Sequence, residues 1–141
     1  VTNTATVSGT GITPVTAAET VNAEAAPNLA ITKSVSPVPV TENGTLTYTF
    51  RIQNYGSVAA TNTTGVVITD TFAPVLNNLT AALNGTAWTA ATDYTYNEAT
   101  GTFSSTAGAI TVPAATYTQD STTGAWVVTP GESTLVITGT V

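Results

Sequence analysis

The sequence predicts an all-β protein built as a sandwich of strands, and three observations support this prediction. Apolar and polar residues alternate along most of the 141-residue chain, as they do in strands with one buried face. Threonine, which favours strands, accounts for 34 of the 141 residues. Turn-forming residues such as Pro130-Gly131 recur between the alternating segments. This spacing is typical of a sandwich of about seven to ten short strands.

The first part of the chain is predicted to be a strand followed by an arm. Residues 1–9 contain the alternating segment Val1–Val7 and the start of the turn-forming run Ser8–Gly11. Residues 10–27 are interpreted as a linker arm. They include an alanine-rich patch with a weak helical period, which could form one helical turn. The remaining residues, 28–141, are predicted to form the sandwich.

Nine strands are expected within residues 28–141. Their predicted ranges are Leu29–Val35, Thr45–Gln53, Val66–Phe72, Asp93–Tyr96, Thr102–Ser105, Ile110–Val112, Thr116–Gln119, Ala125–Thr129 and Ser133–Val141. The ranges 93–105 and 116–129 are each predicted to form a hairpin, because a turn-forming run separates two short strands.

The composition excludes several classes of function. The chain has no cysteine, histidine or methionine, so disulfides, haem ligation and sites built on thiolate or imidazole are absent, and we expect no cofactor and no metal. Lys33 and Arg51 are the only cations, and the net charge of -6 argues against binding to nucleic acid or to an anionic membrane. No apolar run approaches the roughly 20 residues of a membrane span. A surface of hydroxyls, and a chain that begins with Val1, favour an exported, extracellular protein.

Three segments carry a resemblance to a known family. They are Asn28–Val35, Gly44–Gly56 and Val66–Phe72. Together they resemble the repeat of the domain of unknown function 11 family, an Ig-like repeat of bacterial and archaeal surface proteins. Two further pieces, 129–133 and 1–7, resemble the late turn and the last strand of that repeat. The resemblance covers about half of the chain and implies an Ig-like β-sandwich, with residues 79–127 as an insertion that contains a hairpin, and a structural role at the cell surface without a defined activity.

The order of these pieces suggests how the protein assembles. The strand that ends the family repeat comes first here, so Val1–Val7 is expected to act as a donor strand that completes another copy of the chain. The expected acceptor is a groove beside Ser133–Val141 and the strand that begins at Leu29. Contacts of this kind run head to tail and build an open homopolymer, a pilus-like filament. Two alternatives remain open: the arm folds back so that the strand completes its own domain, or the chain is a piece of a tandem array.

Strand parity places three polar residues in line with apolar ones. Lys33 shares a face with Ile31, Asp70 shares a face with Ile68, and Asn3 shares a face with Val1, Ala5 and Val7. Lysine, asparagine and an acid inside such a sandwich could form an isopeptide bond, with Lys33 attacking the Asn3 carboxamide and Asp70 moving protons. Simpler alternatives remain open. Lys33 could form an ion pair with Asp70 or extend to solvent from an edge position, Asp70 could simply end its strand, and Asn3 could bond to backbone groups.

Other signals in the sequence are weaker. Asn43, Asn62, Asn78 and Asn84 each begin an Asn-x-Thr sequon and are possible glycosylation sites. Tryptophans and tyrosines between residues 88 and 126 could form a face for a carbohydrate, or they could pack in the core. The alternative function is therefore a monomeric adhesion or spacer module that binds a host or carbohydrate ligand. An enzyme with turnover is not expected, since the isopeptide reaction would occur once per chain.

Overall fold

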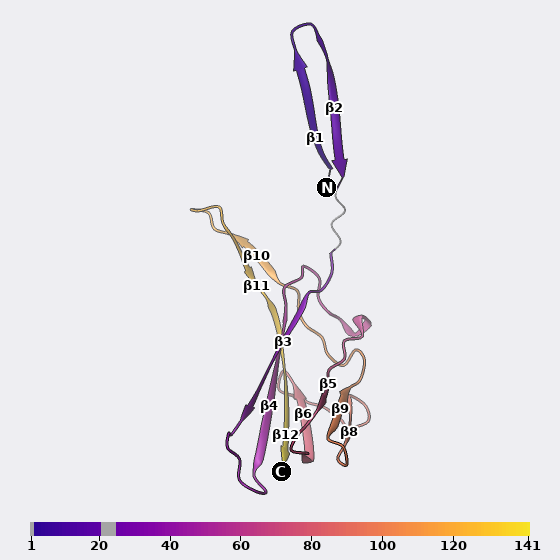
Figure 1. Ribbon diagram of the computed structural model, residues 1–141, viewed down its shortest axis with the longest axis vertical. Coiled ribbons are helices and arrows are strands. Elements are labelled where there is room, and N and C mark those ends of the chain that lie inside the picture. Colours follow the sequence, from indigo (N-terminus) through magenta and orange to yellow (C-terminus); the bar gives the residue numbers. More distant parts are fainter. Residues whose placement is uncertain (1, 21–24) are drawn as a thin grey trace.

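The computed structural model describes residues 2–20 and 25–141, and its architecture is all-β with two facing sheets (Figure 1). The strands are β1 (Thr2–Gly9), β2 (Ile12–Thr20), β3 (Leu29–Ser36), β4 (Thr45–Asn54), β5 (Thr69–Thr71), β6 (Asn77–Leu83), β7 (Thr86–Ala87), β8 (Tyr94–Asn97), β9 (Thr102–Ser105), β10 (Thr116–Gln119), β11 (Trp126–Thr129) and β12 (Gly131–Thr140). A short 3₁₀ helix, η1, spans Asn62–Thr64. The prediction of a β-sandwich is confirmed.

The larger sheet has five antiparallel strands in the order β3-β4-β12-β6-β7. Strands β4 and β12 alternate buried and partly exposed residues along their length, because one face of this sheet covers the core. The smaller sheet has three antiparallel strands in the order β5-β9-β8.

The core between the two sheets is aromatic and aliphatic. The ring of Phe72, directly after β5, lies 4.8 Å from that of Tyr48 on β4. Phe103 on β9 is fully buried, and its ring lies 5.4 Å from that of Tyr94 on β8. Leu135 and Ile137 of β12 are also fully buried. These contacts join the smaller sheet to the centre of the larger one.

Asn54, at the end of β4, anchors one end of the sandwich. The side chain is fully buried, and its Oδ1 accepts hydrogen bonds from the backbone N–H groups of Asn28 and Gly56 at 2.9 Å. Its Nδ2 donates to the backbone oxygens of Val58 and Pro113. The amide therefore fixes the residues just before β3 against two loops at the same end.

Two hairpins stand apart from the sandwich (Figure 1). Strands β1 and β2 pair with each other and, among the described strands, with no other. Strands β10 and β11 form a second separate hairpin, as the sequence predicts. The range 10–27, interpreted above as a linker arm with a possible helical turn, instead contains the strand β2.

Residues 79–127 do not form one separate insertion. Strand β6 starts just before this range and pairs with β12 in the larger sheet, while β8 and β9 supply two of the three strands of the smaller sheet. In this range only the β10-β11 hairpin, which continues to Thr129, pairs with neither sheet.

Candidate functional site: an open groove between the sheets

The inward face of β3 is the first wall of the candidate site. Ile31 pairs with Ile52 of β4 and Lys33 pairs with Phe50, and both partners are buried. Leu29, Ile31, Lys33 and Val35 therefore face the smaller sheet, as strand parity predicts. This face is nevertheless open: Ile31 is 54% exposed, and every residue of β3 is classed as exposed.

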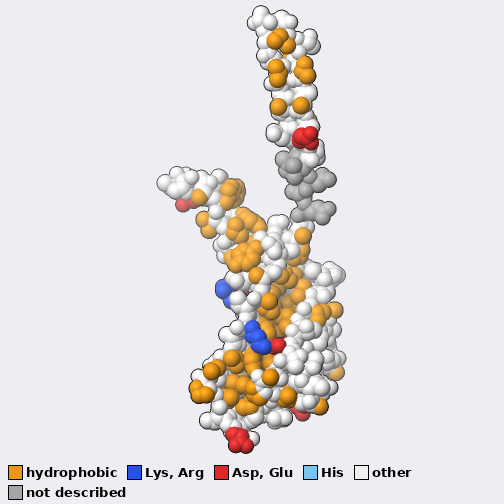
Figure 2. Space-filling view, viewed as in Figure 1, with side chains coloured by type: hydrophobic (Ala, Val, Ile, Leu, Met, Phe, Trp, Pro, Cys, Tyr) orange, Lys and Arg blue, Asp and Glu red, His pale blue; other side chains and the backbone are white. Residues whose placement is uncertain are grey.

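The space over this face is an apolar groove of about 170 Å³. It is lined by Leu29, Ala30, Ile31, Ile52, Val66, Val67 and Ile68. Figure 2 shows hydrophobic side chains exposed along this side of the sandwich. Exposed apolar surface of this kind is a common mark of an interaction site.

The edge of β5 is the second wall of the groove. Among the described strands, β5 pairs with β9 alone, so its other edge is unpaired. The backbone oxygen of Ile68 accepts a hydrogen bond from the backbone N–H of Ser105, and the backbone N–H of Phe72 donates to the backbone oxygen of Gly101. The backbone groups of these alternate residues therefore face β9. The backbone groups of Val67 and Thr69 consequently face the open edge. An unpaired edge beside an apolar groove is suited to the addition of a strand.

Lys33 and Asp70 meet across the groove. The Lys33 Nζ atom lies 2.5 Å from Asp70 Oδ2, with the lysine side chain 41% exposed and the aspartate side chain 19% exposed. The same ammonium lies 4.8 Å from the centre of the Tyr48 ring and 5.3 Å from that of Phe72, within the range of a cation–π contact. The ion pair that the sequence left open as an alternative is present in the single chain.

Asn3 lies elsewhere. It is on β1, opposite Glu19 of β2, and both side chains are exposed. A single chain therefore brings Lys33 and Asp70 together and leaves Asn3 on the separate hairpin.

The hairpin of β1 and β2 has one mainly apolar face. Val7 pairs with Val15 and Ala5 with Ala17, and these pairs share a face with Asn3 and Glu19. Val7 is 67% exposed and Val15 is 66% exposed. Val1, the remaining residue assigned to the donor strand, lies outside the described residues.

Of the two strands expected beside the acceptor groove, the one that begins at Leu29 does line the open groove, whereas Ser133–Val141 is wrong. Residues 133–140 lie in β12, which pairs with β4 on one side and with β6 on the other. Strand β12 is thus central in its sheet and offers no free edge. The open groove lies between β3 and β5 instead.

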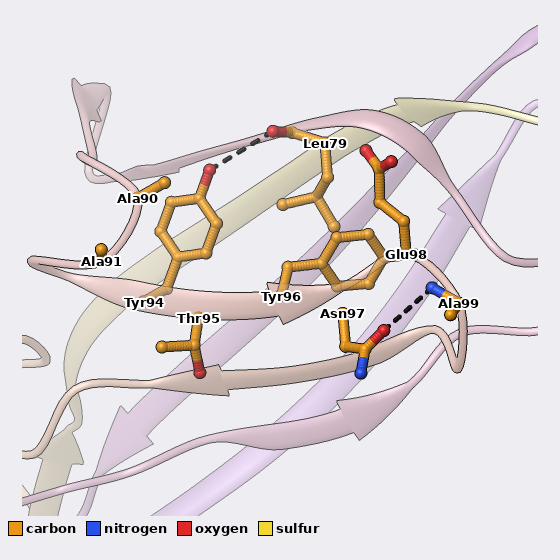
Figure 3. A pocket seen from close by; sticks show the side chains of 9 residues that line it. All are labelled: Leu79, Ala90, Ala91, Tyr94, Thr95, Tyr96, Asn97, Glu98 and Ala99. Carbon is orange, nitrogen blue, oxygen red and sulfur yellow. Dashed lines mark hydrogen bonds between the residues drawn. The ribbon is translucent and has the colours of Figure 1, made fainter.

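A larger open hollow, of about 730 Å³, lies beside β8 and is lined in part by Tyr94 and Tyr96 (Figure 3). The Tyr94 hydroxyl donates to the backbone oxygen of Leu79, and the Tyr96 hydroxyl donates to that of Leu76. Burial raises the pKa of Tyr94. Both tyrosines are thus used in packing, and Trp126 is on the detached β10-β11 hairpin, so the aromatic residues do not form one face.

The four sequons differ in their surroundings. Asn43, Asn62 and Asn78 are exposed, the first and third with φ angles of 59° and 51°. The Asn84 side chain is bonded, because its Nδ2 donates to Ser133 Oγ and its Oδ1 accepts from the N–H of Thr134.

Another ion pair among the described residues lies on the outer face of the larger sheet. The Arg51 guanidinium and the Gln53 amide both donate to the Glu132 carboxylate and hold the pKa of that carboxyl below its usual range. Within residues 2–20 and 25–141, no cluster of three acidic side chains is placed to hold a metal ion. The same residues contain no helix long and apolar enough to cross a membrane.

Comparison with family models, with curated proteins and with solved structures found no match to this chain. The geometry of the groove and the hairpin is therefore the basis for the function proposed below.

The inward positions of Lys33 and Asp70 were predicted from the sequence, but Asn3 lies apart from them, and two backbone features of the site were not predicted. Strand β2 was hidden by Pro14 and by the consecutive alanines Ala17 and Ala18, which interrupt the alternation. The unpaired edge of β5 depends on which strands neighbour it in space, and no local pattern encodes that.

Proposed function

We propose that this protein is a structural subunit of an extracellular filament that polymerises head to tail by donor-strand complementation. The hairpin of β1 and β2 from one copy fills the groove between β3 and β5 of the next copy. The observation that carries the proposal is that one chain contains both an open apolar groove beside an unpaired strand edge and a detached hairpin with an exposed apolar face.

Burial of these two surfaces supplies the driving force. Ile31 and Val67 in the acceptor are 54% and 46% exposed, and Val7 and Val15 in the donor are 67% and 66% exposed. Each apolar side chain that becomes fully buried contributes on the order of 1 to 2 kcal/mol. Added main-chain hydrogen bonds fix the strand in the groove and remove the free edge. Because donor and acceptor are different surfaces of one copy, each head-to-tail junction leaves a free donor at one end and a free groove at the other, so the contact can repeat along a filament.

The same junction supports a covalent cross-link between Lys33 of one copy and Asn3 of its neighbour. A donor hairpin that covers the groove would exclude water from the Lys33–Asp70 pair, and the reaction would begin with transfer of a proton from the ammonium to the carboxylate. The neutral amine then attacks the Asn3 carboxamide carbon, and the protonated Asp70 polarises that group. The bond from Lys33 Nζ to Asn3 Cγ forms and the bond from Asn3 Cγ to its Nδ2 breaks. Asp70 gives its proton to the departing nitrogen, which leaves as ammonia, and then takes up the proton that the attacking nitrogen loses.

The resemblance to the surface-protein repeat and the low charge of the chain fit an extracellular role of this kind. The reaction at Lys33 would occur once per junction and leave the chain modified, so the protein is proposed as a structural subunit and not as an enzyme. The partners of each subunit would be identical subunits.

The filament is tested by comparing the whole chain with a chain that lacks residues 1–20. Size-exclusion chromatography and electron microscopy should show extended polymers for the whole chain and monomers for the shortened one. A monomeric adhesion or spacer module would instead have the same oligomeric state in both forms, and that result would exclude the filament.

The cross-link is tested separately by denaturing gel electrophoresis after boiling, with the intact mass measured for every band. A ladder in which each junction lowers the mass by one ammonia, about 17 Da, is expected. The Asn3→Ala variant is the matched control and should give only monomer at full mass. A whole chain that also gives only monomer at full mass would rule out the isopeptide bond and leave the non-covalent filament to the first test.

A further inference from the structure

We propose that β1 of one copy pairs antiparallel with the free edge of β5 of the next copy, with Asn3 opposite Asp70, while β2 becomes the new outer edge of that sheet. This inference rests on the proposed filament. It specifies which strand enters, in which direction, and in which register.

The choice of β1 as the inner strand follows from Pro14. This residue lies within β2 and has no backbone N–H. A strand between two neighbours uses the donors on both of its edges, so proline is largely confined to edge strands. Strand β1 contains no proline and can pair with β2 on one side and with β5 on the other. With the hairpin in place, the smaller sheet would have the order β2-β1-β5-β9-β8, which equals the larger sheet in strand number.

The direction of β5 is fixed by its contacts with β3. Val66 and Ile68 line the groove together with Leu29 and Ile31, at the start of β3. Further along, Asp70 contacts Lys33. Phe72 then contacts Tyr48, which is the pairing partner of Val35 near the end of β3. The segment through β5 therefore runs in the same direction as β3, away from the end of the sandwich where Asn54 holds Asn28.

This direction separates a filament from the other ways of filling the groove. The hairpin is joined to the sandwich at the start of β3, so in a head-to-tail filament it enters the next copy from the opposite end, with its turn at residues 10–11 leading. Strand β1 runs toward that turn and would therefore lie antiparallel to β5.

A hairpin that folds back into its own groove, or two copies that exchange hairpins reciprocally, would place β1 parallel to β5. Every pairing recorded within the two sheets is antiparallel, and an antiparallel neighbour is slightly more stable for each residue paired. The pairing direction therefore favours the filament.

The register follows from side-chain chemistry. With Asn3 opposite Asp70, an antiparallel strand places Ala5 opposite Ile68 and Val7 opposite Val66. Asn3 would then meet the only ion pair in the groove, and Val7 would enter its apolar part. A shift by two residues would place Ala5 or a residue beyond the start of β1 at the charged pair.

Glu19 strengthens this register. It pairs with Asn3 in the hairpin and is the only charged residue of β1 and β2. In the proposed register its carboxylate would approach Lys33, the only cation in the groove. In the proposed register the Glu19 carboxylate would therefore meet the Lys33 ammonium. In a shifted register the Glu19 carboxylate would be buried without a partner.

The experiment uses engineered cysteines, because the natural chain has none. Thr2 and Thr4 of β1 and Thr69 and Thr71 of β5 are exposed residues on the outer faces. The antiparallel register predicts close pairs between 4 and 69 and between 2 and 71. A parallel strand with the same Asn3–Asp70 contact would instead pair 2 with 69 and 4 with 71. The four double-cysteine chains are therefore matched controls for one another, and each carries Asn3→Ala so that no isopeptide ladder can form.

After mild oxidation, boiled non-reducing gels should show ladders for Thr4→Cys/Thr69→Cys and for Thr2→Cys/Thr71→Cys that collapse on reduction. The parallel pairs should form at least about tenfold less cross-linked product, because Cα atoms more than about 7 Å apart cannot be bridged. Polymers that cross-link through the parallel pairs, or equally through all four, would overturn the register and leave the filament standing. Monomers with an internal disulfide would overturn both proposals.

Discussion

Placing a charge in the groove should block assembly while leaving the fold intact, and Ile31→Asp is the most informative such change. Ile31 is 54% exposed in the free chain, so about half of the 1.5 to 3 kcal/mol available from burying it, or about 1 kcal/mol, is not yet realised. The aspartate would remain hydrated in the free chain. The substitution therefore loses only the other half of the burial energy, which Ile31 already realises in the free chain. This loss should lower the free energy of unfolding by about 1 kcal/mol and the Tm by roughly 2–4 °C.

The same substitution should have a much larger effect on the junction. Once the donor hairpin covers the groove, the carboxylate would be buried against Ile52 and Ile68, which is expected to cost about 4 kcal/mol. A cost of that size weakens association about a thousandfold. Val38→Asp is the matched control, because Val38 is 75% exposed and lies outside the groove.

The assay has two readouts. Thermal unfolding by circular dichroism establishes that Ile31→Asp and Val38→Asp are both folded. Sedimentation velocity then measures polymer length at equal concentrations. The groove would lose its role as the acceptor if the Ile31→Asp chain formed polymers as long as those of Val38→Asp.

Three further predictions concern the scaffold. Asn54→Ala removes a fully buried amide that makes four hydrogen bonds, and it should lower the free energy of unfolding by about 3 kcal/mol in urea titrations, whereas exposed Asn62→Ala should change it by less than about 0.5 kcal/mol. Gly56→Ala would place a Cβ against the backbone of Ala26 and Asn28, so hydrogen exchange should show faster opening of the start of β3; unchanged protection there would contradict this packing. Hydrogen bonds from Arg51 and then from Gln53 lower the pKa of Glu132 in the folded chain, so these bonds should stabilise the fold above the usual glutamate pKa, and the stabilisation should be lost as the pH falls through the lowered pKa. The Tm difference between the parent and Arg51→Gln should therefore vanish in acid. A Tm difference that stays constant with pH would argue against this coupling of Glu132 ionisation to stability.

Much of the fold is visible in the sequence because its strands are patterned. Strands β9 and β10 have the predicted bounds, and β3 and β4 each extend only one residue beyond the prediction. Strand β6 was not predicted, because the run from Asn77 to Leu83 contains adjacent polar residues and adjacent alanines in place of a regular alternation.

Two predicted strands are shorter than expected for reasons that depend on their neighbours. Strand β5 begins at Thr69 and not at Val66, because the N–H of Ile68 donates to the Ser105 side chain and the backbone ladder stops there. The expected strand 110–112 is reduced to a single bridge between Ala60 and Val112, and Pro113, which follows it, has no N–H to continue the ladder.

The inward positions of Lys33 and Asp70 were predictable, whereas the separate position of Asn3 and the location of the groove were not. Parity along each strand is a local property, so the inward positions of Lys33 and Asp70 could be inferred from their own segments. The free edge of β5 and the central position of β12 are set by the order of strands in the sheets. That order depends on contacts between residues far apart in the chain, which explains why the acceptor was expected beside Ser133–Val141.

Head-to-tail donation is tested most directly by mixing two chains that are each blocked at one surface. A Val7→Asp chain keeps its groove but has a defective donor, and an Ile31→Asp chain keeps its donor but has a defective groove. Each should be monomeric alone, and their mixture should form a dimer of one copy of each, as measured by native mass spectrometry. Polymers from either chain alone, or a mixture that stays monomeric while the parent chain polymerises, would contradict donation of the hairpin into the groove between β3 and β5.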